Sequence, residues 1–266
     1  MWTGRARRRN IGPVAEPRTK VLGKAGKLLE LLAANPGTTA PELAQLMAEP
    51  RPSVHRLVQD LVALGYVEPA SRPGTYQLGL GLFRLGSVVA SRLDVRERAR
   101  PVMEELHRAL EETVYLVVRR GDDAVCIERV EGLHIRSMAL QLGGSLPLHL
   151  GAGPRALLAF EPRESWDGYF QRATLEARTP RTPTTRAGLL ALLEEARHRG
   201  YDISDEDVTV GIASVGAPVF DHTGSVRAAL SVGGMRSALM DDGGEKAVKL
   251  VTEGAREVSR RLGFEP

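Results

Sequence analysis

The sequence of 266 residues contains a single cysteine, few aromatic residues (5%) and no apolar run near the roughly 20 residues of a membrane span. One cysteine excludes an internal disulfide framework. The first ten residues, "MWTGRARRRN", lack the apolar stretch of a signal peptide. We therefore expect a cytoplasmic protein with no membrane partner, and we expect Cys126, in the strand-like "DAVCIERV", to be a buried structural thiol.

The sequence also lacks the motifs of metal, nucleotide and nucleophile chemistry. Its six histidines are scattered, and with one cysteine they give no zinc-like spacing. The stretch "GAGPRA" has neither the lysine nor the hydroxyl residue of a phosphate-binding loop. No nucleophile elbow is present. We expect no enzyme, no cofactor and no metal; His149 is interpreted as a partly buried histidine bonded to backbone, and residues 205–207 as an exposed acidic loop.

The net charge is only +3, but basic residues are concentrated near the N-terminus. Within the first 20 residues one acid, Glu16, faces six basic side chains: Arg5, Arg7, Arg8, Arg9, Arg18 and Lys20. We expect residues 1–19 to form a disordered basic arm. Such an arm suits a polyanion, but it is equally typical of a solvated tail, so it does not decide the function alone.

Residues 20–80 have the order helix, short helix, tight turn, helix and two-stranded hairpin. Apolar positions with helical spacing occur in "VLGKAGKLLELLAANPG" and in "PRPSVHRLVQDLVALG". Between them, Thr39 and Glu42 have the spacing of a capping box, and Pro41 fits a first helical turn. "YVEP", "ASRPG" and "TYQLG" read as strand, turn and strand. This order predicts a winged helix-turn-helix.

The third predicted helix carries polar residues at its start that packing alone does not require. In a helix-turn-helix, the second helix of the pair lies in the major groove with its N-terminal residues at base edges. We therefore predict that Arg51, Ser53 and His55 approach bases. We predict that a second set holds phosphates: Arg56, Gln59 and the hairpin residue Arg72. The alternative is a packing or protein-docking module.

The remaining sequence predicts helices followed by a mixed domain. Residues 80–112 read as helical with a break near Asp94, and residues 81–96 are apolar enough to predict a linker helix and dimer surface. From Val114 onward the strand-like runs are "VYLVVRR", "DAVCIERV", "IRSMALQL", "ASVGAPVFD" and "SVRAALSVGG". Helices are expected in "RALLAF", in "TTRAGLLALLEEARHRG" and over the last 24 residues. The prediction for residues 97–266 is an α+β domain around an antiparallel sheet.

Three stretches together resemble the IclR family of bacterial transcriptional regulators. They are "PRPSVHRLVQDLVALGYVE" with "YQLG", "PLHLGAGPRALLA", and "RGYDISDEDVTVGIASVGAPVFD" with "ALSVGG". The resemblance covers about residues 20–262. It implies an N-terminal winged helix-turn-helix, a linker helix and a C-terminal GAF-like effector domain. It also implies homodimers or homotetramers that bind operator DNA and sense a small metabolite, often a carboxylate.

The resemblance further implies an effector site, made of Leu150, Gly151, Ala152, Gly153, Ser204, Ser214, Ser231 and Gly233. Independently, small residues before a helix leave room for a ligand, and a helix start favours an anion. Family members often have an acid at position 204 and a cysteine at 214, and some have a serine at 233. No relative's effector is therefore transferred. Three alternatives stay open: a plain glycine turn, a constitutive DNA-binding protein with a vestigial pocket, and an enzyme with an accessory DNA-binding domain.

Overall fold

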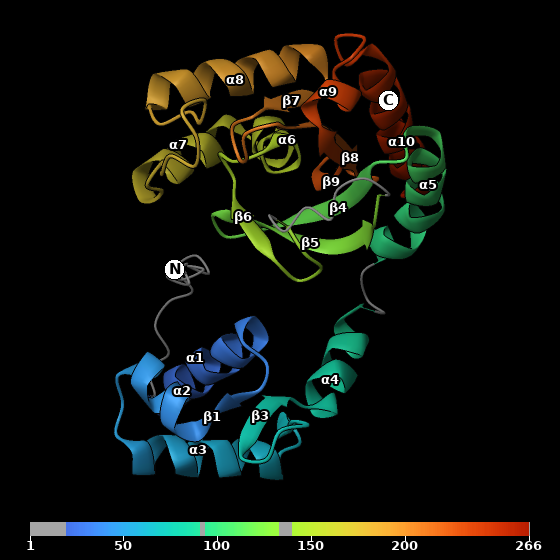
Figure 1. The fold of residues 1–266 in the computed structure, drawn as a ribbon. Helices are drawn as coiled ribbons and strands as arrows, with labels where there is room; N and C mark the ends of the chain where they lie inside the picture. Colours follow the sequence, from blue (N-terminus) through green and yellow to red (C-terminus); the bar gives the residue numbers. More distant parts are fainter. Residues whose placement is uncertain (1–19, 91–93, 133–139, 266) are drawn as a thin grey trace. The chain divides into compact units, whose positions relative to one another are not determined.

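The computed structural model describes residues 20–90, 94–132 and 140–265 (Figure 1). These residues divide into two compact units, one ending by Leu93 and the other beginning at Asp94. The predicted basic arm, residues 1–19, lies outside the described residues. Among the helices of the described part, none is long and apolar enough to cross a membrane.

The N-terminal unit is a bundle of three helices with a small antiparallel sheet. Its helices are α1 (Lys20–Ala34), α2 (Ala40–Met47) and α3 (Arg51–Ala63), and its strands, in sheet order, are β1 (Thr38–Thr39), β3 (Thr75–Leu78) and β2 (Val67–Pro69). One buried apolar cluster joins the helices to β2; its members include Leu28, Leu32, Leu43, Met47, Val54, Val58, Leu61 and Val67. The predicted winged helix-turn-helix is confirmed.

Local signals fix the helix ends as the sequence predicts. Glu42 Oε2 accepts the Thr39 N–H at 2.8 Å, and Thr39 Oγ1 accepts the Glu42 N–H at 3.4 Å, which confirms the capping box. Gly65, with φ +71°, follows α3 in a conformation that favours glycine. In α1 only the second half of the predicted apolar face is buried, because Val21 and Leu22 are 61% and 64% exposed.

Two helices follow the wing. They are α4 (Leu80–Ala90) and α5 (Asp94–Leu110), so the predicted break falls between them, at residues that the structure does not describe. The start of α4 is attached to the end of α3, since the Gly81 N–H donates to Gly65 O at 2.9 Å. A Cβ atom at Gly79 or Gly81 would lie about 2.5 Å from that oxygen or closer. Only glycine permits this approach.

The C-terminal unit is built on a six-stranded antiparallel sheet. The strand order is β6 (Ser145–Pro147), β5 (Asp123–Val130), β4 (Thr113–Arg120), β9 (Val226–Met235), β8 (Ile212–Phe220) and β7 (Asp202–Asp205). On one face, α5 and α10 (Glu245–Arg261) cover a cluster that includes Leu116, Val215 and Val251. The predicted α+β class is confirmed.

The opposite face of the sheet carries the remaining long helices (Figure 1). They are α6 (Ala152–Phe160), α7 (Arg163–Arg172) and α8 (Arg186–Arg199), and a short α9 (Arg236–Leu239) follows β9. The α6 helix packs on β8 and β9 along almost its whole length, and each residue from Ala152 to Ala159 is buried. Layers of helix, sheet and helix therefore enclose two separate apolar cores.

Some elements differ from the prediction or lie outside the described residues. The run "IRSMALQL" falls mostly on residues 133–139, outside the described residues, and its end, Leu140–Leu142, is not a strand. The strands β6 and β7 were not predicted, because three or four residues are too few for a clear period-2 pattern. The helix α7 was not predicted either, because its buried residues, Trp166 and Tyr169, are too few to show a clear helical spacing. The exposed acidic loop was also wrong: Asp205 ends β7, and Asp207 is buried at 4% exposure, because the charges of both are paired with arginines.

Candidate functional site

The first candidate site is the solvent side of α3. Its apolar side, Val54, Val58 and Leu61, is buried against α1 and α2. Five of the residues predicted to contact DNA lie on α3. Ser53 is half-buried, and the other four are exposed: Arg51, His55, Arg56 and Gln59. The structure thus brings all five onto the first turns of one helix, with their side chains away from the core.

The start of α3 lies close to the start of α2. Arg51, Pro52 and His55 line a hollow of about 210 Å³ together with Ala40 and Pro41. The positive ends of two helix dipoles are therefore near each other and near two basic or titratable side chains. This arrangement favours an anion such as a backbone phosphate.

The wing brings the sixth predicted residue to the same unit. Arg72 is exposed in the turn between β2 and β3, and β3 pairs with β1 directly before α2. The pKa of Glu42 is lowered, first by the hydrogen bond from the Thr39 backbone and hydroxyl, and further by the charge of Arg72. The wing arginine therefore lies near the start of α2.

The second candidate site is a cavity of about 70 Å³ in the C-terminal unit. A cavity that holds one water needs about 10–15 Å³ in this measure, so the space suits a small organic molecule. Seven of the eight predicted effector residues line it, and the eighth, Leu150, is fully buried beside it without lining it. The other lining residues are Tyr115, Val117, Leu140, Leu146, Pro154, Val208, Thr209 and Ile212.

Glycines give the cavity its shape. A Cβ atom at Gly153 would lie 3.1 Å from Ser231 Cβ, and one at Gly216 would lie 2.6 Å from the Ala152 carbonyl carbon. Glycine at these positions lets the start of α6 approach the sheet closely. Gly151, which precedes α6 with φ +84°, turns the chain into the helix. The lining residues of this end of the cavity are therefore backbone and small side chains.

Each of the three serines of the lining makes one hydrogen bond to the protein. Ser214 Oγ accepts the Ala152 N–H at 3.3 Å, which satisfies one donor of the helix start. The Ser231 hydroxyl donates to Val215 O at 2.9 Å. The Ser204 hydroxyl donates to Asp207 Oδ1. The sequence pointed to these serines but not to their partners.

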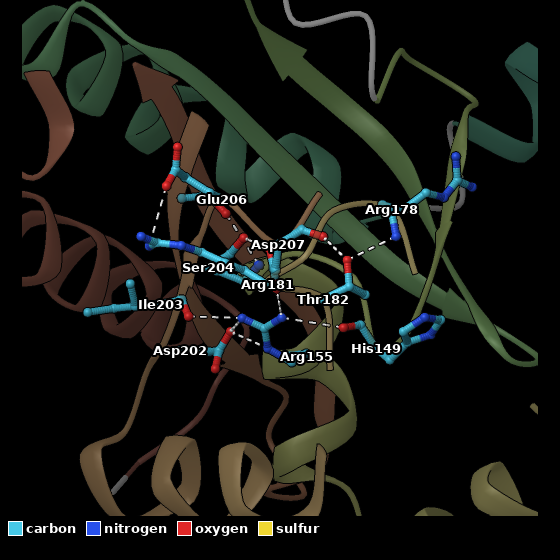
Figure 2. A network of polar contacts seen from close by, with 12 residues as sticks. His149, Arg155, Arg178, Arg181, Thr182, Asp202, Ile203, Ser204, Glu206 and Asp207 are labelled. Carbon is cyan, nitrogen blue, oxygen red and sulfur yellow. Dashed lines mark hydrogen bonds and ion pairs between the residues drawn. The ribbon is translucent and has the colours of Figure 1, made fainter. Parts of the chain in front are cut away.

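Sequence reasoning missed the charged network beside the cavity, which Figure 2 shows. Arg155, 1% exposed, projects from α6 and donates to Asp202 Oδ2 at 2.9 Å and to Asp207 Oδ2. It also donates to Ile203 O at 2.9 Å and to His149 O at 3.3 Å. The signal was an arginine alone among apolar residues in "PRALLAF", because a charge in a buried helix requires a partner.

This network holds β7 and the segment after it against α6. Burial raises the pKa of Asp202 to about 7, while the adjacent Arg155 charge acts in the opposite direction. The Thr182 hydroxyl donates to Asp207 O at 2.6 Å, and the Thr179 hydroxyl donates to Glu206 O at 2.7 Å. The turn that carries the lining residues Val208 and Thr209 is therefore fixed from several sides.

Two exposed arginines add ion pairs at the end of β7. Arg181 Nη1 lies 2.8 Å from Asp205 Oδ2, and Arg236 Nε lies 2.6 Å from Asp205 Oδ1. Arg236, followed by Arg181, lowers the pKa of Asp205. Such exposed pairs contribute little stability individually, so among the ion pairs of β7 the buried ones of Arg155 restrain the strand most.

Two other candidate residues have structural roles. His149 is fully buried; its Nδ1 lies 2.8 Å from the Tyr169 hydroxyl and its Nε2 lies 3.3 Å from Glu176 O, and burial lowers its pKa. Cys126 is buried, as predicted for a structural thiol, and burial raises the pKa of this thiol to about 12. In the described part of the chain, no group of histidine, cysteine and acidic residues could hold a metal ion.

Together, a winged three-helix unit with an exposed polar helix and a sheet unit with a small internal cavity define the class of two-unit helix-turn-helix transcriptional regulators. Residues 21–71 match the profile of the IclR helix-turn-helix domain, and residues 87–260 match that of the bacterial transcriptional regulator IclR C-terminal domain. The chain belongs to the IclR family. It is a DNA-binding transcriptional regulator, as its curated relatives are, and not an enzyme.

The relatives match over nearly the whole chain. The HTH-type transcriptional regulator KipR of Bacillus subtilis is 34% identical over 93% of this chain and 98% of its own length. The HTH-type transcriptional repressor AllR of Escherichia coli K12 is 32% identical, with 95% and 93% covered.

Solved structures show the same arrangement of elements. The Thermotoga maritima IclR structure has a TM-score of 0.76 at 30% identity and covers 91% of this chain and 98% of its own. An IclR homologue from Microbacterium hydrocarbonoxydans, complexed with 4-hydroxybenzoate, has a TM-score of 0.80 at 25% identity, with 91% and 98% covered.

Proposed function

We propose that the chain binds a near-palindromic operator, with one α3 helix in the major groove of each half-site. The observation that carries this proposal is the exposed polar start of α3 above a buried apolar stripe. Arg51, Ser53 and His55 lie nearest the helix start, where side chains reach base edges. Arginine contributes specificity through a bidentate contact with guanine.

The remaining predicted residues position the protein on the duplex. Arg56 and Gln59 lie one and two turns further along α3, and Arg72 lies on the wing. We assign all three to phosphates, where they fix register and make the affinity depend on salt but carry no sequence information. Because the operator is part of the chromosome, we place the protein in the cytoplasm.

We further propose that the chain acts as a homodimer or homotetramer. In this division residues 20–80 bind DNA, residues 81–96 form a linker helix and dimer surface, and residues 97–266 form the GAF-like effector domain. Two apolar side chains of α4 support the dimer surface, since Leu80 is 75% exposed and Leu85 is 47% exposed. A second copy would remove such apolar area from water, and two-fold symmetry would match a palindromic site.

The cavity of the C-terminal unit is the proposed effector site. We propose a small carboxylate whose charged end lies at the start of α6, beside Ala152, Gly153 and Ser214. A helix start favours an anion, and the 4-hydroxybenzoate in the Microbacterium structure carries a carboxylate. An effector that binds one arrangement of the oligomer better than another shifts operator affinity by that difference, typically ~1–3 kcal/mol.

Fluorescence anisotropy tests the operator proposal. The purified protein is titrated against its own upstream intergenic DNA and against unrelated DNA of equal length, over a series of salt concentrations. We expect tight, sequence-selective binding with a steep salt dependence. Equal weak binding of both DNAs, repeated across fragments of the neighbouring operons, would contradict the proposal.

A further inference from the structure

The three serines of the cavity have hydrogen-bonding roles that their protein partners fix. A hydroxyl group has one proton to donate and two lone pairs that accept. When its partner can only accept, the hydroxyl must donate to it, and only lone pairs are left for a ligand. When its partner can only donate, the proton is left for a ligand. The partners of Ser204, Ser214 and Ser231 each have one such role.

Ser204 and Ser231 present acceptors to the cavity. The Ser204 hydroxyl faces Asp207 Oδ1, while Arg155 pairs with the other oxygen of this carboxylate. A carboxylate only accepts, so Ser204 donates to it. The partner of Ser231 is the carbonyl oxygen of Val215, which also only accepts. Both serine oxygens therefore have lone pairs, and no proton, to offer a ligand.

Ser214 has the opposite role. Its partner is the backbone N–H of Ala152, which only donates, so Ser214 Oγ accepts and its own proton is available to a ligand. The same end of the cavity holds the positive end of the α6 dipole. No charged side chain is among the residues that line the cavity within the described ranges. An anionic group is therefore best stabilised beside Ser214 and the helix start.

The polar groups of the cavity thus fall into two sets with opposite roles. The start of α6 and Ser214 offer donors, whereas Ser231 on β9 and Ser204 on β7, the cross-strand neighbour of Ser214, offer acceptors. A ligand with only a carboxylate leaves the acceptors without a donor inside a mostly apolar space, which costs free energy. Ser204 is the stronger acceptor, because its own proton is drawn toward an anion and hydrogen bonds in a chain strengthen one another.

From this polarity we infer that the cavity selects a small carboxylate that also carries a hydroxyl group, and that the ligand's hydroxyl donates to Ser204. We further infer that Asp207 is a positioning residue that creates this preference without lining the cavity. The inference rests on the proposed effector site. It adds a specific class, the small hydroxy acids, and a residue outside the cavity that determines the class.

The position of Asp207 is itself fixed. Its carboxylate is paired with the buried Arg155, and its backbone oxygen accepts the Thr182 hydroxyl at 2.6 Å (Figure 2). At 4% exposure, Asp207 has almost no surface open to water that could replace these partners. Ser204 therefore cannot rotate its proton into the cavity without leaving a buried carboxylate oxygen unpaired, which is unfavourable.

A matched pair of small acids tests the inference. Lactate and propionate share a carboxylate and a carbon skeleton, and only lactate has a hydroxyl. Isothermal titration of the full-length protein measures both dissociation constants. We expect lactate to bind about five- to tenfold more tightly than propionate, the effect of one hydrogen bond. Ser204→Ala should reduce this ratio to near one, whereas Ser237→Ala, on the exposed surface of α9, should leave it unchanged.

Two further variants separate positioning from general damage. In Asp207→Asn, the amide oxygen must face the donors of Arg155, so the amide NH₂ faces Ser204 and turns the Ser204 proton toward the ligand. The lactate hydroxyl can accept that proton, so we expect this variant to keep binding lactate and propionate. Pyruvate, whose keto oxygen only accepts, should bind the variant more tightly than the wild-type protein. Ser214→Ala should weaken the binding of lactate and of propionate by a similar factor, because it removes a contact to the carboxylate that both acids share. The ratio of the two dissociation constants should therefore stay the same.

The outcomes distinguish the inference from the proposal on which it rests. If the wild-type protein binds lactate and propionate equally, or if Asp207→Asn does not raise the affinity for pyruvate, the inference is wrong and the carboxylate site stands. If neither lactate nor propionate binds at millimolar concentrations, both are wrong. A lactate preference that disappears in Ser204→Ala but not in Ser214→Ala, together with tighter binding of pyruvate by Asp207→Asn, supports both.

Discussion

The surface of α3 and the cavity of the C-terminal unit use polar residues in opposite ways. On α3, side chains such as Arg51 and His55 are exposed and have water as an alternative partner. In the cavity, Ser204 and Ser231 are 3% and 5% exposed and are already bonded to the protein. An exposed side chain can change its hydrogen-bonding partners when a ligand binds. A buried hydroxyl that is already bonded to the protein can offer a ligand only the donor or the acceptors that its protein partner leaves free. The first region suits a long polyanion and the second suits one small molecule.

The largest expected effect concerns Arg155, whose loss would remove the rigidity on which this contrast depends. Arg155→Met leaves Asp202 and Asp207 without their cation in the protein interior. Breaking a buried pair in this way costs about 3–5 kcal/mol. Urea denaturation should show a loss of that order in the free energy of unfolding. Arg227→Met, an exposed arginine of the same unit, is the control and should change it by less than about 0.5 kcal/mol. Equal effects would show that the buried network does not hold the sheet.

A bulky residue at the cavity should separate the two regions functionally. Ala152 lines the cavity and is fully buried. We expect Ala152→Leu to abolish the effect of a carboxylate effector on operator affinity, a coupling of about 1–3 kcal/mol in the wild type. Operator binding without effector should remain within about twofold. Anisotropy titrations with and without the effector measure both quantities, and a retained response would place the effector elsewhere.

Substitutions on α3 should separate base contacts from phosphate contacts. We expect Arg51→Ala to reduce the discrimination between operator and random DNA by roughly 1–3 kcal/mol. Arg56→Ala is the matched comparison, because it removes the same charge one turn further along the helix. It should weaken the binding of both DNAs alike. It should also lower the slope of log affinity against log salt concentration by about one, the contribution of one phosphate contact. If both variants lose affinity for the two DNAs equally, Arg51 does not read bases.

The smallest expected effect is a pH dependence of stability due to His149. Burial lowers the pKa of this imidazole in the folded protein, so between the folded and unfolded values the unfolded chain binds more protons. The contribution is complete above the unfolded pKa, roughly 6.5, and is lost as the pH falls from that value through the lowered pKa of the folded protein. His149→Gln should flatten the fall in melting temperature between pH 7.5 and pH 5. His222→Gln, at an exposed turn, should keep the wild-type slope.

The sequence predicted α2, α3 and the placement of the polar residues off the apolar stripe of α3, because these signals are local. Helical spacing, the Thr39–Glu42 box and Gly65 all act within a few residues. The cavity residues Ser204, Ser214 and Ser231 came from the family resemblance and not from a pattern. They lie on three different strands, and the register of β7, β8 and β9 brings them together.

The partners of the cavity residues could not be predicted from local patterns. Arg155 and Asp207 are 52 residues apart, and Asp207 belongs to a segment that composition alone assigned to an exposed loop. In the structure Asp207 is buried instead, because the buried Arg155 guanidinium compensates the charge of its carboxylate. Long-range pairing of this kind has no period or spacing that a single sequence displays.

The partners of the serines determine which of them can change in evolution without a second change. Ser231 is bonded to the backbone oxygen of Val215, which every amino acid at that position supplies, so its role survives any substitution of its partner. The partner of Ser204 is a side chain, so a single replacement at Asp207 alters what the cavity accepts while every residue that touches the ligand stays the same. With the effector site that we propose, a descendant of this regulator can therefore acquire a different effector through one mutation outside the residues that touch the ligand.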